Sequence, residues 1–269
     1  MRKAFTILLM LVMASVSLAS GAVYDELPDL EGQEILVAVE NQYTPYQFED
    51  PRADEPIGFE YDIVEEVCRR INCVPVYETT TFEIQLSGTA NGDFDLAMNG
   101  LFLTEERAEV YDFSIPYTQA EAYLLARAGE DRFTDFVNFA EVAVDSDLII
   151  GVQSGSFGQF LVTPDAYNVP ESQVVTFDEF GALLVALENG DIDTMVVDAF
   201  GGEFVSSTGD IFELVGEPVA DPVDTGFIFP KDSDLDEAFN AALESMMADG
   251  YIDYLTYKWS VDFAPLAEE

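Results

Sequence analysis

Short apolar runs alternate with amphipathic stretches along this chain, and the alternation occurs twice, once before about residue 118 and once from about residue 148. The short runs are typical of buried strands, and the longer stretches place apolar residues three and four positions apart, as on one face of a helix. Strands that alternate with helices favour parallel sheets covered by helices. The sequence therefore predicts an α/β protein built from two sheet-containing halves.

The strand and helix positions can be read from these patterns. Strands are predicted at 34–39, 74–80, 93–99, 148–152, 174–177, 192–198 and 225–230. Helices are predicted at 58–71, 178–190 and 233–250, and a Gly-Ser turn leads into a further helix within 153–162. Ser233 is the expected N-cap of the last helix, and the helix at 178–190 turns four apolar residues inward, namely Phe180, Leu183, Leu184 and Leu187.

Two polar, proline-containing segments, 115–122 and 216–224, are the natural connections between the two halves. Ligands of such folds bind outside the carboxyl ends of the strands. Arg107 follows one predicted strand end, Ser156 follows another, and Asp198 ends a third. These positions make the three residues candidates for a binding site.

The N-terminus has the pattern of a secretory signal. Arg2 and Lys3 precede a 16-residue apolar run that ends in small residues, with cleavage expected after Ala19 or Ala22. A membrane anchor is the alternative, but the run is shorter than the roughly 20 apolar residues that a spanning helix needs. No cysteine lies near the cleavage point, so no lipid-anchor residue is expected there.

The charge balance excludes several classes of partner. The chain has 53 acidic and 10 basic side chains, a net charge of −43. Nucleic acids and anionic membranes both require clustered Lys and Arg, so neither is an expected partner. The acidity is instead typical of a solvated, repulsive surface that keeps a protein in solution.

The residue types present also restrict the chemistry. The chain has no histidine, which excludes Ser-His-Asp triads and histidine zinc sites. It contains no glycine-rich phosphate-binding motif, and we expect no cofactor and no metal. Its two cysteines, Cys68 and Cys73, are expected to form a short-loop disulfide after export, with two free thiols as the alternative.

Arg107 is an unusual cation in so acidic a chain. It follows Glu105 and Glu106 and precedes Glu109, and one interpretation is a surface ion pair with these glutamates along a helix. Alternatively, its planar guanidinium binds a ligand carboxylate. Asp198 likewise either caps the helix that follows it or binds an ammonium. A ligand that satisfies both charges is an amino acid.

Tyr43 and Phe82 complete this set of candidates. They are either core residues or flat apolar walls for a ligand. Spacing alone does not separate these alternatives.

Seven segments in order resemble the extracytoplasmic solute-binding proteins of polar amino-acid ABC importers, from about residue 33 to residue 262. Each segment is weak alone, but together they identify the family. The segments are VENQYTPYQF (39–48), IGFEYDIVEEV (57–67), NGDFDLAMNGLFLTEERAEVYDFSIPY (91–117), IGVQSGSF (150–157), LENGDIDTMVVD (187–198), GFIFPKDSDL (226–235) and ADGYIDYLTYKW (248–259).

The resemblance implies a type II periplasmic-binding-protein fold, with two Rossmann-like lobes joined by two crossover strands and a ligand cleft between them. Residues 1–22 would be the signal peptide, 31–118 plus 226–269 the first lobe, and 119–225 the second lobe with the hinge segments. The implied function is to bind a free L-amino acid in the periplasm or outside the cell. The protein would deliver it to the permease of an ABC importer, acting as a monomer and without catalysis.

The resemblance also implies residue roles. Arg107 would hold the ligand α-carboxylate and Asp198 the α-ammonium, while Tyr43 and Phe82 would enclose the ligand side chain. Backbone donors near Gly100, Phe102 and Ser156 would assist at the carboxylate. The ligand-binding residues expected on this basis are Glu40, Tyr43, Phe82, Asn99, Gly100, Phe102, Arg107, Ser156, Phe157 and Asp198.

Departures from the family pattern concern the ligand more than the fold. Gly100, Phe102 and Phe157 stand where the family usually has Ser or Thr, so hydroxyl donors are lost. Gln85 and Thr89 replace apolar residues in the helix after Phe82, which predicts a less regular helix.

The sequence does not decide whether Glu40 selects a ligand with a positively charged side chain. If Glu40 faces the ligand side chain, arginine or lysine would balance its charge; if it bonds to backbone or water, glutamine or another neutral ligand would bind. Two other functions also remain: an enzyme on this fold, such as a cyclohexadienyl-type dehydratase using an acid such as Glu40, and a ligand-sensing domain.

Overall fold

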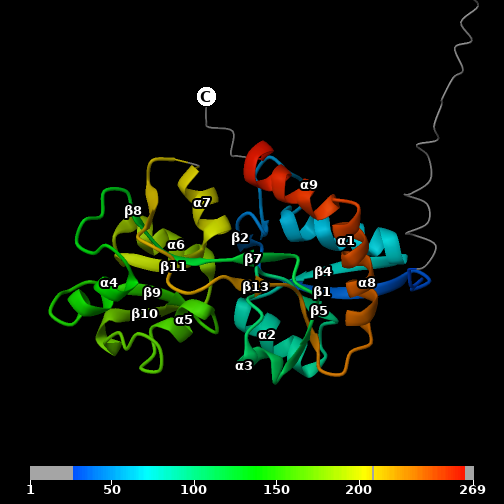
Figure 1. The fold of residues 1–269 in the computed structure, drawn as a ribbon, viewed down its shortest axis with the longest axis horizontal. Coiled ribbons are helices and arrows are strands. Elements are labelled where there is room, and N and C mark those ends of the chain that lie inside the picture. Colours follow the sequence, from blue (N-terminus) through cyan, green and yellow to red (C-terminus); the bar gives the residue numbers. More distant parts are fainter. Residues whose placement is uncertain (1–26, 208, 264–269) are drawn as a thin grey trace, which may run out of the picture.

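The computed structural model describes residues 27–207 and 209–263, which form two lobes side by side (Figure 1). The predicted signal peptide at 1–22 lies outside the described residues. No helix in the described ranges is long and apolar enough to cross a membrane. Each lobe is built around one five-stranded sheet, as the twofold alternation in the sequence predicts.

The first sheet is buried on both faces. Its second strand, β1, pairs in parallel with β4 and β5. Alternate β1 residues face opposite sides, so Ile35 and Val37 belong to one apolar core and Leu36 and Ala38 to another. The strand order is β4 (Cys73–Thr79), β1 (Gln33–Val39), β5 (Leu96–Ala97), β14 (Ile228–Pro230) and β6 (Tyr111–Phe113).

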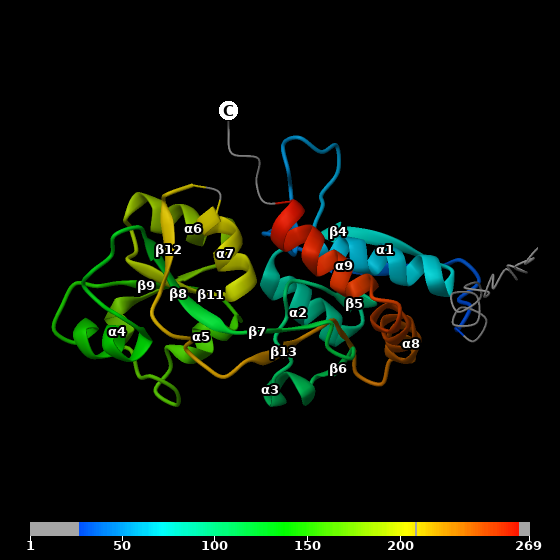
Figure 2. The ribbon, with the colours of Figure 1, turned by 45° about the horizontal axis from the view of Figure 1, so that its top comes forward.

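Helices cover both faces of this sheet. On one side lie α1 (Phe59–Ile71), α8 (Leu235–Ala248) and α9 (Tyr251–Tyr257), and on the other lies α2 (Phe82–Asn91) (Figure 2). The disulfide between Cys68 and Cys73 joins the last turn of α1 to the start of β4, with a Cα–Cα distance of 4.4 Å.

The second sheet repeats this plan. The apolar side chains of β8 alternate between a core under α4 (Phe136–Ala143) and α5 (Phe157–Leu161) and a core under α6 (Phe180–Asn189) and α7 (Ala199–Ser207). The strand order is β10 (Val174–Phe177), β9 (Ile150–Gln153), β11 (Thr194–Asp198), β8 (Ala122–Arg127) and β12 (Phe212–Val215).

Two antiparallel linking strands, β7 (Thr118–Ala120) and β13 (Val223–Thr225), run between the lobes (Figures 1 and 2). They explain why neither sheet is wholly parallel. A strand that enters a lobe directly from a linking strand starts at the cleft edge and runs away from it. β8 and β14 enter in this way, and both are antiparallel to their neighbours.

The remaining elements near the cleft are short. They are β2 (Gln42–Tyr43), β3 (Gln47–Phe48) and α3 (Glu105–Ala108).

Three predicted details differ from the structure. The strand predicted at 93–99 contains only two ladder residues, because β1 pairs with it only at Leu96 and Ala97 and β14 only at Ala97. The last long helix begins at Leu235, with Asp234 rather than Ser233 at the N-cap position, although the Ser233 hydroxyl accepts a hydrogen bond from the Leu235 N–H.

The prediction of an irregular helix after Phe82 was wrong, since α2 is a continuous ten-residue helix whose N-cap is Thr81. It buries Gln85 and Thr89 completely, and their side-chain polar atoms have no hydrogen-bond partner within the described residues.

Candidate functional site

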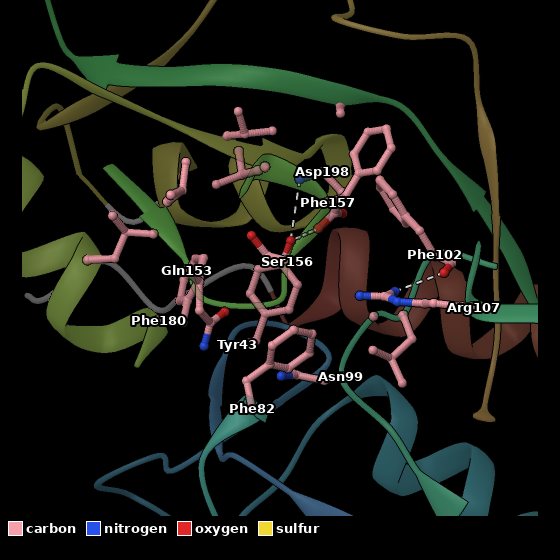
Figure 3. Close-up of a pocket in the computed structure, with 18 residues that line it drawn as sticks. Tyr43, Phe82, Asn99, Phe102, Arg107, Gln153, Ser156, Phe157, Phe180 and Asp198 are labelled. Atoms are coloured by element: carbon pink, nitrogen blue, oxygen red, sulfur yellow. Dashed lines mark hydrogen bonds between the residues drawn. The ribbon is translucent and has the colours of Figure 1, made fainter. Parts of the chain in front are cut away.

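A pocket lies between the two lobes, at the carboxyl ends of β5, β9 and β11 (Figure 3). Both lobes contribute to its wall, as expected for a cleft that closes around a ligand. The lining residues are Tyr43, Phe82, Asn99, Gly100, Leu101, Phe102, Arg107, Ala122, Val152, Gln153, Ser156, Phe157, Gly158, Phe180, Leu183, Val196, Val197 and Asp198. Arg107 and Asp198 are the only charged residues among them.

Arg107 points into this pocket from the short helix α3 (Figure 3). Its Nη1 donates to the carbonyl of Phe102 at 2.9 Å, and its Nη2 donates to the carbonyl of Gly155, in the other lobe, at 3.2 Å. The guanidinium carbon lies 5.9 Å from the ring centre of Phe82. Burial lowers the pKa of Arg107 to about 10.

The surface-pair alternative for Arg107 is wrong. Within the described residues, Arg107 forms no ion pair, whereas each of the other seven Lys and Arg side chains there pairs with a carboxylate. A half-buried cation whose side-chain hydrogen bonds go only to neutral carbonyl groups has an unsatisfied preference for an anion. Arg107 is thus suited to bind a carboxylate.

Asp198 ends β11 and is almost fully buried. Its carboxylate accepts hydrogen bonds from the hydroxyls of Tyr43 and Tyr46 and, at 3.1 Å, from the N–H of Gly201. The helix-capping alternative is therefore confirmed, because Gly201 lies in the first turn of α7. Burial raises the pKa of Asp198, and no Lys or Arg in the described ranges pairs with it.

Aromatic side chains form much of the wall between the two charges. The ring of Tyr43 stacks on Tyr46, with centroids 5.3 Å apart, and lies 4.5 Å from the ring of Phe180. The rings of Phe102 and Phe157 pack edge to face at 5.1 Å. The core alternative holds for Phe82, which belongs to the core beneath the first sheet, and Phe82 also lines the pocket.

Several predicted site residues have partners of their own. Glu40 is not among the lining residues of the pocket; it bonds to Asn99 and Gln153, and burial raises its pKa. The N–H of Gly100 donates to Glu60 at 3.0 Å, and the N–H of Ser156 donates to the carbonyl of Gln153. These two backbone donors are engaged within the protein and not free for a ligand carboxylate.

Sequence reasoning missed several residues at this site, of which Phe180, Gln153 and Glu60 are informative. Phe180 was interpreted only as a core residue, and Gln153 is the last residue of β9, a position at a strand end that could have identified it. Glu60 lies fully buried behind the pocket and accepts hydrogen bonds from the hydroxyl of Tyr117 and the N–H of Gly100. Burial raises the pKa of Glu60 to about 7.

The site's charges suit an organic zwitterion rather than a metal. Across residues 27–207 and 209–263 no cluster of three or more carboxylate or cysteine side chains has the arrangement of a metal site. An unpaired cation and a carboxylate without a basic partner line the same cleft. A ligand that carries one carboxylate and one ammonium would satisfy both.

Comparisons with known proteins agree with this geometry. Residues 35–262 match the family model described as bacterial extracellular solute-binding proteins, family 3. The chain is 26% identical over 234 residues to an arginine-binding periplasmic protein of Mannheimia haemolytica. The alignment covers 85% of this chain and 92% of that protein. The chain is also 26% identical over 230 residues to an L-cystine-binding protein of Escherichia coli strain K12, covering 84% and 82%.

A solved structure shows the same fold. An ancestral arginine-binding protein bound to glutamine superposes with a TM-score of 0.74 and is 26% identical. The match covers 84% of this chain and 97% of that chain.

Proposed function

The chain belongs to the bacterial extracellular solute-binding proteins of family 3, and from that premise we propose that Arg107 and Asp198 bind the two charged ends of a free L-amino acid. The chain is a binding protein of an amino-acid ABC importer rather than an enzyme, in keeping with its named relatives. It acts outside the cytoplasm, in the periplasm or extracellular space.

One observation carries the proposal of residue roles. In a chain of 53 acids, Arg107 is the single described cation without an ion pair, and it faces the same pocket as a buried carboxylate without a basic partner. When every other cation of the described ranges is paired, such a residue is kept at a structural cost, because buried charges are stable only when partnered. An α-carboxylate at Arg107 and an α-ammonium at Asp198 would remove both costs at once.

The side chain of the ligand is expected to be uncharged. Arg107 and Asp198 carry opposite charges, so a zwitterion with a neutral side chain leaves the pocket neutral. The rest of the wall is mainly aromatic and aliphatic, with Phe102, Phe157 and Leu183 among its members. A second ligand charge against such a wall would be unpaired and costly.

The wider arrangement belongs to the same proposal. The first lobe comprises 31–118 and 226–269, and the second comprises 119–225. Residues 1–22, which lie outside the described residues, would direct export, and the protein acts as a monomer that delivers its ligand to a membrane permease.

A thermal-shift panel of the twenty amino acids tests the function. A ligand that binds only the folded state stabilises it by about 2.7 kcal/mol at a concentration of 100 Kd. We expect amino acids with neutral side chains to raise the melting temperature more than arginine, lysine, aspartate or glutamate. A panel in which no amino acid raises it would contradict the proposed function, and a response to arginine alone would contradict the neutral side chain.

A further inference from the structure

Helix α6 lacks an N-cap from its own lobe. Glu179 occupies the N-cap position, but its side chain accepts no hydrogen bond from the first turn. The first N–H groups of a helix have no intrahelical partner and require acceptors from elsewhere. The structure supplies these acceptors from the opposite lobe.

Two side chains of the first lobe cap α6. The N–H of Phe180 donates to Oε1 of Glu40 at 3.0 Å, and the N–H of Gly181 donates to Oε1 of Gln42, also at 3.0 Å. Glu40 follows β1 and Gln42 lies in β2, so both acceptors come from one segment across the cleft. We call these two hydrogen bonds the cross-lobe cap.

The carboxylate of Glu40 is held in place for this role. Oε2 accepts from Nδ2 of Asn99 at 2.9 Å, and Oε1 also accepts from Nε2 of Gln153 at 2.7 Å. Glu40 is only 2% exposed. Its negative charge lies at the positive end of the α6 dipole, where a carboxylate is stabilising.

Gly181 leaves room for the close approach of Gln42. A Cβ built on Gly181 would lie 2.5 Å from Oε1 of Gln42, closer than such atoms approach. Any larger residue at this position pushes the amide of Gln42 away. The glycine therefore permits the second bond of the cross-lobe cap, although glycine itself weakens a helix.

We propose that Glu40 and Gln42 form a detachable N-cap for α6 that is made only when the lobes close, and that it sets the balance between open and closed forms. The inference rests on the proposed function for its effect on ligand affinity, but the effect on closure is independent of any ligand. When the lobes separate, the first N–H groups of α6 exchange these acceptors for water. Losing a helix cap shifts an equilibrium by several-fold to about thirtyfold.

This role has a consequence for specificity. Both oxygens of Glu40 already accept hydrogen bonds from protein donors, and Glu40 does not line the pocket. Its charge is directed at α6 and not at a ligand side chain. Removing that charge should lower the affinity for every ligand by the same factor, because affinity falls with the population of the closed form.

The test combines four variants with two measurements. Glu40→Gln removes the charge, Gln42→Ala removes the second acceptor, and Gly181→Ala displaces it without altering any pocket residue. Glu179→Gln is the matched control, because it removes a neighbouring exposed charge that makes no cap. Spin labels on Val76→Cys and Val185→Cys, exposed positions in opposite lobes, report the interlobe distance in ligand-free protein.

We expect the first three variants to increase the population with a long interlobe distance, and the control to match the parent. Calorimetry should show that Glu40→Gln lowers the affinity for the two tightest-binding amino acids of the panel by the same factor, within about twofold. An altered ratio between those ligands would overturn the proposal and place Glu40 at the ligand side chain.

Unchanged interlobe distances in both Glu40→Gln and Gly181→Ala would also overturn the proposal. The distance measurement needs no ligand, so it decides the question even if no amino acid binds. Thermal unfolding of Gly181→Ala checks that the fold is intact.

Discussion

Replacing Glu60 by Gln should change the pH dependence of stability by an amount that follows from its burial. Glu60 is fully buried, Oε1 accepts from Tyr117 and Gly100, and Oε2 has no partner within the described residues. Burial raises its pKa from 4.5 to about 7, and the nearby carboxylate of Asp198 adds to the rise. The protonated form is therefore favoured in the folded protein.

The sign and size of the effect follow by linkage. A carboxyl with a raised folded-state pKa contributes stability that is fully present below pH 4.5 and is lost as the pH rises through about 7. A shift of this size at about 1.4 kcal/mol per unit corresponds to about 3 kcal/mol. The parent should lose about that much relative to Glu60→Gln between pH 4 and pH 8.

The assay is urea unfolding of both proteins without ligand, at intervals between pH 4 and pH 8. At each pH, the unfolding free energy of Glu60→Gln is subtracted from that of the parent. The other titrating groups are common to both proteins, so their contributions cancel in this difference. A difference that falls by about 3 kcal/mol with rising pH supports the argument. A difference that stays constant within about 0.5 kcal/mol would refute the assignment of Glu60 as a buried, protonated acid.

Three further predictions concern binding and packing. Arg107→Ala and Asp198→Asn should each weaken amino-acid binding by about 2–5 kcal/mol, as calorimetry would measure, while leaving the fold intact; parent-like affinity in either would remove that residue from the site. Gln85→Leu should raise the unfolding free energy by about 1–3 kcal/mol, because it removes a buried amide without partners; a loss of stability in urea would indicate a hidden partner. Gly58→Ala should destabilise by more than about 1 kcal/mol, since its Cβ would lie 2.1 Å from the carbonyl oxygen of Tyr46, and a neutral effect in the same assay would contradict that contact.

Sequence patterns predict the parts of this fold that depend on local periodicity. The alternation around β1 and the apolar face of α1 gave the correct elements, because both depend on spacing within one segment. The direction of β8 and β14 was beyond this reasoning. It follows from where the linking strands deliver the chain, which is a property of the two-lobed arrangement rather than of either strand's residues.

At the candidate site, too, some residues could be predicted from the sequence and others could not. Arg107 and Asp198 could be proposed from the sequence because Arg107 follows a predicted strand end and is a cation in a very acidic chain, and Asp198 is the last residue of a predicted strand. The partners of Glu40 could not be predicted from the sequence, because the start of α6, which contacts Glu40 across the cleft, lies 140 residues away in the chain. Glu60 was also missed, since a glutamate in the first turn of a helix ordinarily faces water.

The pairing of one ligand carboxylate with Arg107 and one ligand ammonium with Asp198 is tested most directly by calorimetry with modified ligands. The amino acid that gives the largest thermal shift is compared with its carboxamide, which lacks the negative charge, and with its N-acetyl derivative, which lacks the positive one. We expect each derivative to bind the parent at least about thirtyfold more weakly, because each leaves one buried charge unpaired.

The variants then assign each charge. Arg107→Ala should no longer distinguish the acid from the carboxamide, and Asp198→Asn should no longer distinguish the free amine from the acetylated one. Derivatives that bind the parent within about threefold of the free amino acid would contradict the central claim.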